Sequence, residues 1–177
     1  MNDILYEIDQ EFKLRIKEIR ESLESVLGRK GFTLEQKLRG MEGLVFESIV
    51  HDFTKKEIKT RTNLDIAIST QQKITGRAKC DLVIENHIFI EVKKSGIYSY
   101  SPDNYRKYHN ILTKQGNKYL FLNWRESTDK HVKFCKDIWE DYTFILNRGK
   151  FNDPFNKLRH DHNEWERYVQ TIIKLLN

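Results

Sequence analysis

The sequence predicts an α/β protein, a mixed central sheet flanked by helices, in a single domain of 177 residues. Three patterns predict this fold class. Apolar residues recur at steps of three and four within residues 3–55, as they do in amphipathic helices. Alternation of apolar and polar residues then indicates two short strands within residues 78–95. An almost continuous apolar run at 118–124 is typical of a strand that is buried on both faces.

The composition narrows the functional classes. The formal net charge is +5 and the isoelectric point is about 9.1, which suits a polyanionic partner such as nucleic acid. Two cysteines without a pairing pattern favour a reducing compartment, so we expect a cytoplasmic, intracellular or nucleoid-associated protein. No apolar run approaches the roughly 20 residues of a membrane span. The acidic N-terminus does not have the pattern of a signal peptide.

Residues 3–27 are predicted to form a long helix, which Gly28 would end as a C-terminal cap. Its apolar stripe is narrow and close to a heptad repeat. The stripe consists of Leu5, Ile8, Phe12, Ile16, Ile19, Leu23 and Val26. It can pack on its own domain, or residues 1–30 can act as an arm that forms a homodimer, and the sequence leaves both interpretations open.

A second helix is expected at 33–55, where Thr33 and Gln36 have the spacing of an N-terminal capping box. Glu47 lies among apolar neighbours on this helix, and His51 shares its face four residues later. Basic residues at the end of the helix can interact with its dipole or contact phosphates. They are Lys55, Lys56, Lys59 and Arg61.

The next elements are expected to be strands. Residues 63–70 are predicted to form the first one, and 71–76 a polar turn. Two further strands within 78–95 would be joined by a tight turn at Glu85 and Asn86. Since successive side chains of a strand alternate between faces, the opposite sides of these two strands should be apolar. Those sides would carry Cys80, Leu82 and Ile84 on one strand and Ile88, Ile90 and Val92 on the other.

The polar sides of the same two strands hold the candidate functional residues. Asp81 shares a face with Lys79 and Val83, and Glu91 shares a face with Lys93. Two carboxylates and a lysine in the middle of a sheet need partners, because buried charge is costly unless it is paired or bound to an ion. A hard divalent cation such as Mg²⁺, which prefers oxygen ligands, is a suitable partner.

The rest of the chain is predicted to be mostly helical. A helix should start near Pro102 and end at Gly116, and further helices are expected at 129–145 and 164–176, after the strand at 118–124. The segment between these last helices is rich in basic and aromatic residues, so it either binds nucleic acid or is a loop that Phe151 and Phe155 anchor. His160, Asp161 and His162 are expected in a solvated loop, because further ligands at structural-zinc spacing are missing.

Asp81, Glu91 and Lys93 form a D-x9-E-V-K motif on the predicted hairpin, within the order helix, three strands, helix, strand. This arrangement resembles the PD-(D/E)xK nuclease superfamily, whose fold is called restriction endonuclease-like. The resemblance covers about residues 41–124, and Cys80 stands where the family name has proline. It implies an αβββαβ core at 31–127, which the N-terminal arm at 1–30 precedes and a C-terminal helical extension at 128–177 follows.

The resemblance also implies a set of site residues. Mg²⁺ or Mn²⁺ would be held by Asp81, Glu91, the main-chain carbonyl of Val92 and Glu47 from the preceding helix. Lys93 would act on the attacking water or stabilise the charge at phosphorus. Lys94 would contact a phosphate or be solvated. Other candidates for a place among the ligands are Glu42, His51 and Asp65.

The function implied is that of a metal-dependent endonuclease that hydrolyses DNA and leaves a 5′-phosphate. Three alternatives stay open: an RNA endonuclease of the viral cap-snatching type, a Holliday-junction resolvase, and a nucleic-acid-binding module that keeps the fold without the activity. For the three motif residues themselves, the alternative is an ion pair on an exposed sheet face, a common and weak arrangement.

Overall fold

The computed structural model describes residues 3–27, 31–94, 102–124, 129–148 and 159–177. A five-stranded sheet with the order β1-β2-β3-β4-β5 lies at its centre. The strands are β1 (Ile68–Thr75), β2 (Ala78–Ile84), β3 (Ile88–Lys93), β4 (Lys118–Asn123) and β5 (Thr143–Ile145). The pairs β1–β2 and β2–β3 are antiparallel, whereas β3–β4 and β4–β5 are parallel. The predicted α/β class with a mixed sheet is therefore confirmed.

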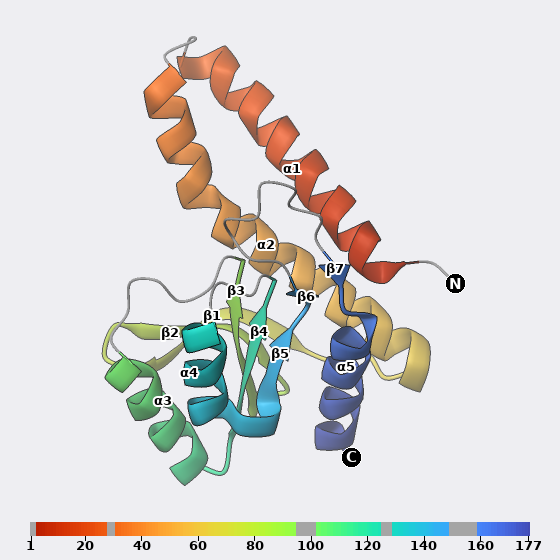
Figure 1. Ribbon diagram of the computed structural model, residues 1–177. Coiled ribbons are helices and arrows are strands. Elements are labelled where there is room, and N and C mark those ends of the chain that lie inside the picture. Colours follow the sequence, from red (N-terminus) through yellow and green to blue (C-terminus); the bar gives the residue numbers. More distant parts are fainter. Residues whose placement is uncertain (1–2, 28–30, 95–101, 125–128, 149–158) are drawn as a thin grey trace.

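Helices cover both faces of the sheet (Figure 1). One face packs against α2 (Gly31–Thr62), α5 (His162–Leu176) and the start of α1 (Ile4–Leu27). The other face packs against α3 (Pro102–Lys114) and α4 (Asp129–Trp139). The strands β3 and β4 are buried on both sides between these layers, which explains their almost continuous apolar sequence.

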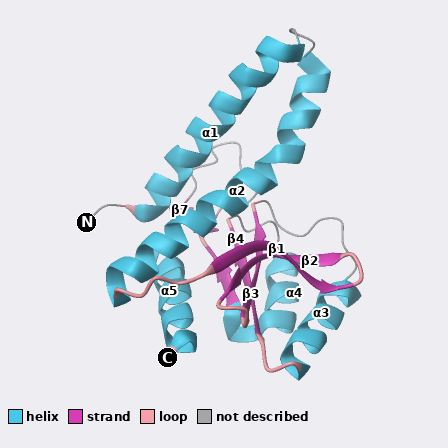
Figure 2. Cartoon of the chain, turned by 180° about the vertical axis from the view of Figure 1, so that it is seen from behind, coloured by secondary structure: helices cyan, strands magenta, loops and turns pink. Residues whose placement is uncertain are grey.

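The helices α1 and α2 form a hairpin whose far end extends beyond the sheet (Figure 2). Leu5 and Ile8 at the start of α1 are fully buried in the core, so this end packs on its own domain. Further along, Leu14 is 51% and Val26 is 78% exposed. The helix expected at 3–27 is confirmed, and Gly28, its expected cap, lies outside the described residues.

The tight turn predicted between the two motif strands is confirmed. Glu85 and Asn86 have φ angles of +49° and +61° between β2 and β3, as in the type I′ turns that join hairpin strands. The helix expected after Pro102 spans Pro102–Lys114, and Gly116 follows it with φ +79°. Because left-handed backbone is accessible to glycine without a Cβ clash, this residue suits the end of the helix.

The boundaries of the first strand and of α2 differ from the prediction. The helix begins at Gly31, before the expected cap Thr33, and continues to Thr62. The first strand starts at Ile68 and runs to Thr75, so it includes most of the expected polar turn. Since β1 is an edge strand with a solvent-exposed side, its polar residues did not reveal it as a strand.

The expected helix at 129–145 was wrong in its last third. The helix α4 ends at Trp139, a short 3₁₀ turn η1 (Glu140–Tyr142) follows, and Thr143–Ile145 form β5 at the second edge of the sheet. A strand of three residues gives too little alternation to be distinguished from a helical pattern. Its Thr-Phe-Ile composition nevertheless suits a strand.

Two further expectations are corrected. His160 is not in a solvated loop, because β7 (Arg159–His160) pairs with β6 (Asn147–Arg148), and α5 begins directly afterwards at His162. Cys80 does not pack with Leu82 and Ile84 but belongs to the cluster on the opposite face of the sheet.

Phe151 and Phe155 lie outside the described residues. Among the described helices, none is long and apolar enough to cross a membrane.

Candidate active site

The candidate site lies where β2 separates from β3. The two strands pair at Leu82–Ile90, Val83–Phe89 and Ile84–Ile88. One residue before Leu82, the contact between the two strands is made by a side chain and not by the main chain. Asp81 Oδ2 accepts the Val92 N–H at 2.8 Å. Asp81 is only 7% exposed. The acidic group is thus fixed at the opening between the strands, next to the end of β3.

Cys80 supports this opening from the other side. Its Sγ donates to the Ile90 carbonyl at 3.2 Å and to the Leu82 carbonyl at 3.5 Å. Burial raises the pKa of the Cys80 thiol well above its ordinary value, and the charges of Glu91 and Asp81 add to the effect. The thiol therefore stays protonated and acts as a hydrogen-bond donor that steadies the two strands.

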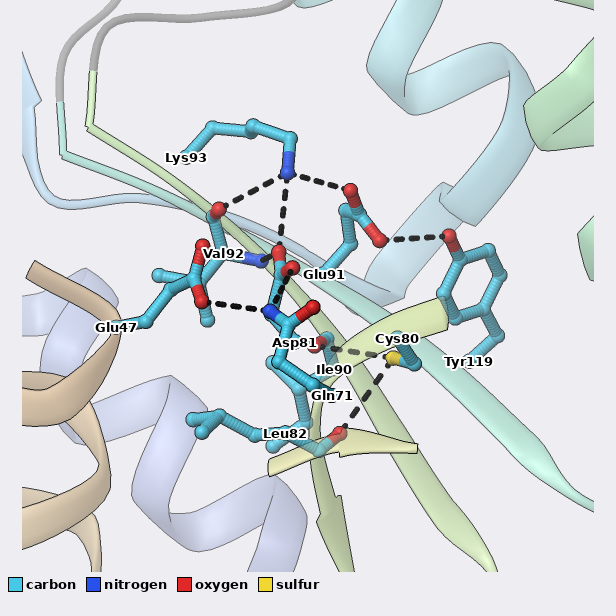
Figure 3. Close-up of polar contacts among 10 residues, drawn as sticks. All are labelled: Glu47, Gln71, Cys80, Asp81, Leu82, Ile90, Glu91, Val92, Lys93 and Tyr119. Atoms are coloured by element: carbon cyan, nitrogen blue, oxygen red, sulfur yellow. Dashed lines mark hydrogen bonds and ion pairs between the residues drawn. The ribbon is translucent and has the colours of Figure 1, made fainter. Parts of the chain in front are cut away.

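Lys93 lies among three oxygen atoms of the site (Figure 3). Its Nζ is 3.0 Å from Asp81 Oδ2, 2.5 Å from Glu91 Oε1 and 3.2 Å from the Val92 carbonyl oxygen. Burial opposes the charge on Lys93, but the carboxylates of Glu91 and Asp81 outweigh that cost and raise its pKa. Lys93 is therefore protonated at neutral pH and holds the acidic groups together.

Glu91 is fixed by a second contact from the neighbouring strand. Its side chain is buried, and Oε2 accepts the hydroxyl of Tyr119 on β4 at 3.3 Å. Burial raises the pKa of Glu91, with the positive charge of Lys93 opposing the shift. The two carboxylate oxygens of Glu91 thus have separate partners, which set the orientation of the group.

Glu47 reaches the same site from α2. Gln71 on β1 connects it to the motif residues, since the amide nitrogen Nε2 donates to Glu47 Oε2 at 2.9 Å and to Asp81 Oδ1 at 3.3 Å (Figure 3). Burial and the nearby charge of Asp81 raise the pKa of Glu47 to about 7, although Lys93 and Gln71 act in the opposite direction. Glu47 is therefore part of the acidic cluster.

Gln71 was not predicted as a site residue. Its φ angle is +53°, in the left-handed region that non-glycine residues rarely adopt, so its backbone is strained at the point where its amide meets Glu47 and Asp81. Such strain tends to occur at functional sites. No sequence pattern pointed to Gln71, because it stands in a polar segment that was expected to be a turn.

The oxygen atoms of this site fit a hard divalent cation. Carboxylates from Asp81, Glu91 and Glu47, together with the Val92 carbonyl, are the ligand type that Mg²⁺ and Mn²⁺ prefer. The ammonium of Lys93 now lies among the oxygens of Asp81, Glu91 and Val92. A divalent cation in its place would supply the positive charge that this ammonium supplies.

Three other ligand candidates make contacts elsewhere. Glu42 accepts from Lys94 Nζ at 2.5 Å, and that ammonium also lies 4.2 Å from the ring centroid of Phe12. His51 contacts its neighbour Asp52, with 2.9 Å between Nδ1 and Oδ1. Asp65 lies 3.8 Å from Lys55. The structure therefore joins only Glu47 to the motif residues among the acidic candidates of α2 and the following segment.

The four basic residues of α2 that were predicted to bind nucleic acid do not gather at the site, whereas Lys94 directly follows Lys93. Eight residues of helix, about 12 Å along its axis, separate Lys55 from Glu47, and the other candidates lie further along. Arg61 is engaged by two carboxylates, at 2.6 Å from Glu57 and 2.7 Å from Glu166. Lys56 lies 3.8 Å from Glu7, and Lys59 donates to the Asn63 carbonyl at 3.2 Å.

Other basic residues lie closer to the site, on the β1–β2 hairpin. Lys73 and Lys79 are direct cross-strand partners, two residues beyond Gln71 and two residues before Asp81. That spacing corresponds to about 6–7 Å along a strand. Both lysines and Arg77 at the turn are exposed, and none has an ion pair within the described parts of the chain. These residues were not predicted to lie near the site, because a turn was expected at 71–76, where β1 continues to Thr75.

Comparison with known protein families, curated proteins and solved structures finds no match for this chain.

Proposed function

We propose that this protein is a Mg²⁺- or Mn²⁺-dependent phosphodiester hydrolase, an endonuclease whose first expected substrate is DNA. The observation that carries the proposal is the convergence of Asp81, Glu91 and Lys93 with the Val92 carbonyl in a buried site at the end of β3. Paired carboxylates, a main-chain oxygen and a lysine that is protonated at neutral pH are the groups that metal-assisted phosphate chemistry needs.

The arrangement of elements supports the same proposal. The elements follow the order α2, β1, β2, β3, α3, β4, in which β2 is antiparallel to both β1 and β3, and β4 is parallel to β3. This arrangement is compatible with the αβββαβ core of the PD-(D/E)xK superfamily. The motif residues stand on β2 and β3, and Glu47 comes from the helix before the sheet. We therefore include a restriction endonuclease-like core at 31–127 in the proposal.

The burial of the motif residues argues against the alternative of an ion pair on an exposed sheet face. Asp81 is 7% and Glu91 is 6% exposed, so both carboxylates are desolvated on folding. Buried ion pairs frequently stabilise a protein less than apolar residues of the same size would, because desolvation consumes the Coulomb gain. A third acid, Glu47, whose pKa is raised to about 7, makes the cluster still more costly. Perturbed acidic groups of this kind concentrate at functional sites.

The roles of the residues follow from their contacts. Asp81, Glu91, Glu47 and the Val92 carbonyl would hold the cation, which when bound would neutralise charge on the phosphate and lower the pKa of a water molecule. Lys93 stays protonated, so it cannot accept a proton, but its ammonium can stabilise the negative charge that develops at phosphorus during attack. Gln71 and Tyr119 would orient the carboxylates that they contact.

The hairpin next to the site supports a polyanionic substrate. Lys73 and Lys79 are like charges in direct cross-strand positions, an unfavourable pairing unless an anion compensates it. A nucleic-acid backbone that passes over this hairpin would bring its phosphates to the opening between β2 and β3. The chemistry of these contacts is common to DNA and RNA, so an RNA endonuclease and a junction resolvase are outcomes of the test below.

The proposal also includes association of two copies through α1. Leu14 at 51% and Val26 at 78% exposure are apolar positions on this helix that the chain itself leaves open. Removing the whole helix would take Leu5 and Ile8 out of the core. The suitable test is therefore Leu14→Lys with Val26→Lys, which should turn a dimer into a monomer in sedimentation equilibrium. A wild-type chain that sediments as a monomer would refute this part.

Incubation with Mn²⁺ and a panel of nucleic acids tests the proposed activity. The panel contains supercoiled plasmid, single-stranded DNA, RNA and four-way junctions, and the matched control is Asp81→Asn, which can still accept the Val92 N–H. We expect cleavage of DNA that leaves 5′-phosphate ends and is lost with EDTA and in the variant. Cleavage of RNA or junctions alone would redirect the proposal to those substrates, and equal cleavage by the variant would refute it.

A further inference from the structure

A second group of potential metal ligands lies where the N-terminal and C-terminal parts of the chain meet. It consists of Asp3, directly before α1, His160 on β7, and His162, the first residue of α5. One ligand atom from each residue lies within 4.8 Å of the others. The group shares no residue with the site at the end of β3.

The distances within this group suit a four-coordinate transition metal. His160 Nδ1 is 3.6 Å from Asp3 Oδ1, and His162 Nε2 is 3.4 Å from Asp3 Oδ2. Metal–ligand bonds of about 2.0–2.1 Å in a tetrahedral zinc site place neighbouring ligand atoms about 3.3 Å apart. Small side-chain adjustments would therefore bring all three ligand atoms to one ion.

The backbone around each ligand is fixed by contacts of its own. Asp3 Oδ1 accepts the Tyr6 N–H at 2.9 Å, and the Asp3 carbonyl accepts the Glu7 N–H at 2.9 Å, so Asp3 is held at the start of α1. His160 is paired with Asn147 across the β6–β7 ladder. The Asp161 N–H donates to the Leu146 carbonyl at 2.9 Å, which fixes the segment between the two histidines. Ligands on such supported segments are preorganised.

The exposure of the group leaves room for a fourth ligand. The side chain of His160 is 15% exposed, against 45% for Asp3 and 51% for His162. His160 faces the interior, where its ring lies 6.0 Å from that of Trp124. The other two side chains border solvent, so a water molecule can reach the remaining position. Two histidines, one carboxylate and an open position form a known type of zinc coordination.

We propose that Asp3, His160 and His162 bind a Zn²⁺-class ion, which links the start of α1 to the β7–α5 segment. Two imidazoles and one carboxylate favour Zn²⁺ or Co²⁺, whereas the all-oxygen group at the end of β3 favours Mg²⁺ or Mn²⁺. Ligand type would therefore direct different ions to the two sites. The N-termini of α1 and α5 disfavour a cation through their dipoles, and the negative charge of Asp3 compensates for this effect.

Titration of the EDTA-treated, full-length chain with Co²⁺ tests the proposal directly. We expect one equivalent to give the visible d–d absorption of a tetrahedral ion, and Zn²⁺ to displace it. Zn²⁺ should also raise the melting temperature, because the ligands come together only in the folded chain. The variants Asp3→Asn and His162→Ala should each weaken binding by more than the roughly 10- to 100-fold that loss of an outer-shell partner costs.

Two control variants, one elsewhere on the surface and one in the proposed active site, accompany the ligand variants. Asn remains a good helix N-cap, so Asp3→Asn keeps the start of α1 while it removes the charged ligand. His109→Ala removes a histidine of α3 that lies outside the group and should leave Co²⁺ binding unchanged. Asp81→Asn should leave the tetrahedral spectrum intact. The proposal is overturned if no tetrahedral spectrum appears, or if Asp3→Asn and His162→Ala bind Co²⁺ as the wild type does.

Discussion

The ammonium of Lys93 lies 3.0 Å from Asp81 Oδ2, across the point where β2 and β3 separate. The same oxygen accepts the Val92 N–H, so one carboxylate both closes the end of the strand pair and holds the lysine. Lys93 therefore occupies the position among the acidic groups where the proposed chemistry needs positive charge. This relationship makes the roles of the two residues experimentally separable.

Lys93→Met should separate catalysis from metal binding. We expect the cleavage rate to fall by about 10²–10³-fold, the usual cost of losing an electrostatic contact to the transition state. Mn²⁺ affinity should stay equal or increase, because the ammonium no longer competes for the oxygens of Asp81 and Glu91. Calorimetric titration of the variant with Mn²⁺ measures this. The assignment of Lys93 is wrong if the variant loses Mn²⁺ binding to the same extent as Asp81→Asn.

Glu47→Gln should change how stability depends on pH. The pKa of Glu47 is raised from 4.5 to about 7 by burial and by Asp81. Between these values the folded chain keeps a proton that the unfolded chain has released, so the free energy of unfolding falls as pH rises through this window. Above about pH 7 the ionised Glu47 lowers the free energy of unfolding by its full amount. Glutamine carries no charge, so Glu47→Gln avoids this loss of stability, while its side-chain oxygen can still accept from Gln71.

Urea unfolding of EDTA-treated protein at pH 5 and pH 8 measures this effect. The unscreened shift corresponds to roughly 3 kcal/mol, and solvent screening of the partly exposed carboxyl reduces the expected gain of Glu47→Gln at pH 8 to about 1–2 kcal/mol. Little difference is expected at pH 5. The other groups that face Glu47 are Asp81, Glu91 and Lys93. They are present in both proteins, so their contributions to the pH dependence of stability cancel when the variant is compared with the wild type. Parallel stability profiles for the two proteins would contradict the interpretation.

Gln71 should have a positioning role that is separable from its strained backbone. Both Gln71→Ala and Gln71→Gly remove the amide that connects Glu47 with Asp81, so both should lower Mn²⁺ affinity by about 10- to 100-fold. They differ in the backbone, because only glycine adopts φ +53° without strain. Gln71→Gly should therefore be more stable than Gln71→Ala by about 1–2 kcal/mol. Wild-type Mn²⁺ affinity in both variants would show that the amide has no such role.

The hairpin lysines should contribute to substrate binding and not to the chemical step. In the double variant Lys73→Gln, Lys79→Gln we expect a higher KM at an unchanged kcat. The logarithm of the binding constant falls linearly with the logarithm of the salt concentration. Each lost phosphate contact should make this slope shallower by about 0.9, so the loss of both contacts should make it shallower by about 2. Lys55→Gln with Lys56→Gln on α2 is the matched control. Equal effects of the two double variants would indicate that neither pair has a particular place at the substrate.

Much of the fold could be predicted from the sequence where the local pattern is strong. The helices near residues 3–27 and 102–114 and the strand at 118–124 have long apolar periodicities that tertiary packing reinforces. The first strand could not be placed, because β1 is a polar edge strand. The strand β5 was missed because its three residues carry almost no periodic information.

The candidate site divides in the same way. Asp81, Glu91 and Lys93 lie in one hairpin, so their even spacing was sufficient to predict that they come together. Whether Glu47 joins them depends on how α2 packs against the sheet, which local sequence patterns do not determine. Gln71 could not be found, since its position depends on a left-handed backbone conformation that no residue type in that segment suggests. The approach of Asp3 to His162 joins the two ends of the chain, and local patterns carry no information about such contacts.

The most direct measurement is the anomalous difference density of a crystal soaked in Mn²⁺. We expect a peak that contacts one carboxylate oxygen each of Asp81 and Glu91 and the main-chain oxygen of Val92, with the Lys93 ammonium moved away from its present place between them. A soaked crystal in which Lys93 Nζ still bridges the two carboxylates, without a manganese peak there, would contradict the proposed metal site.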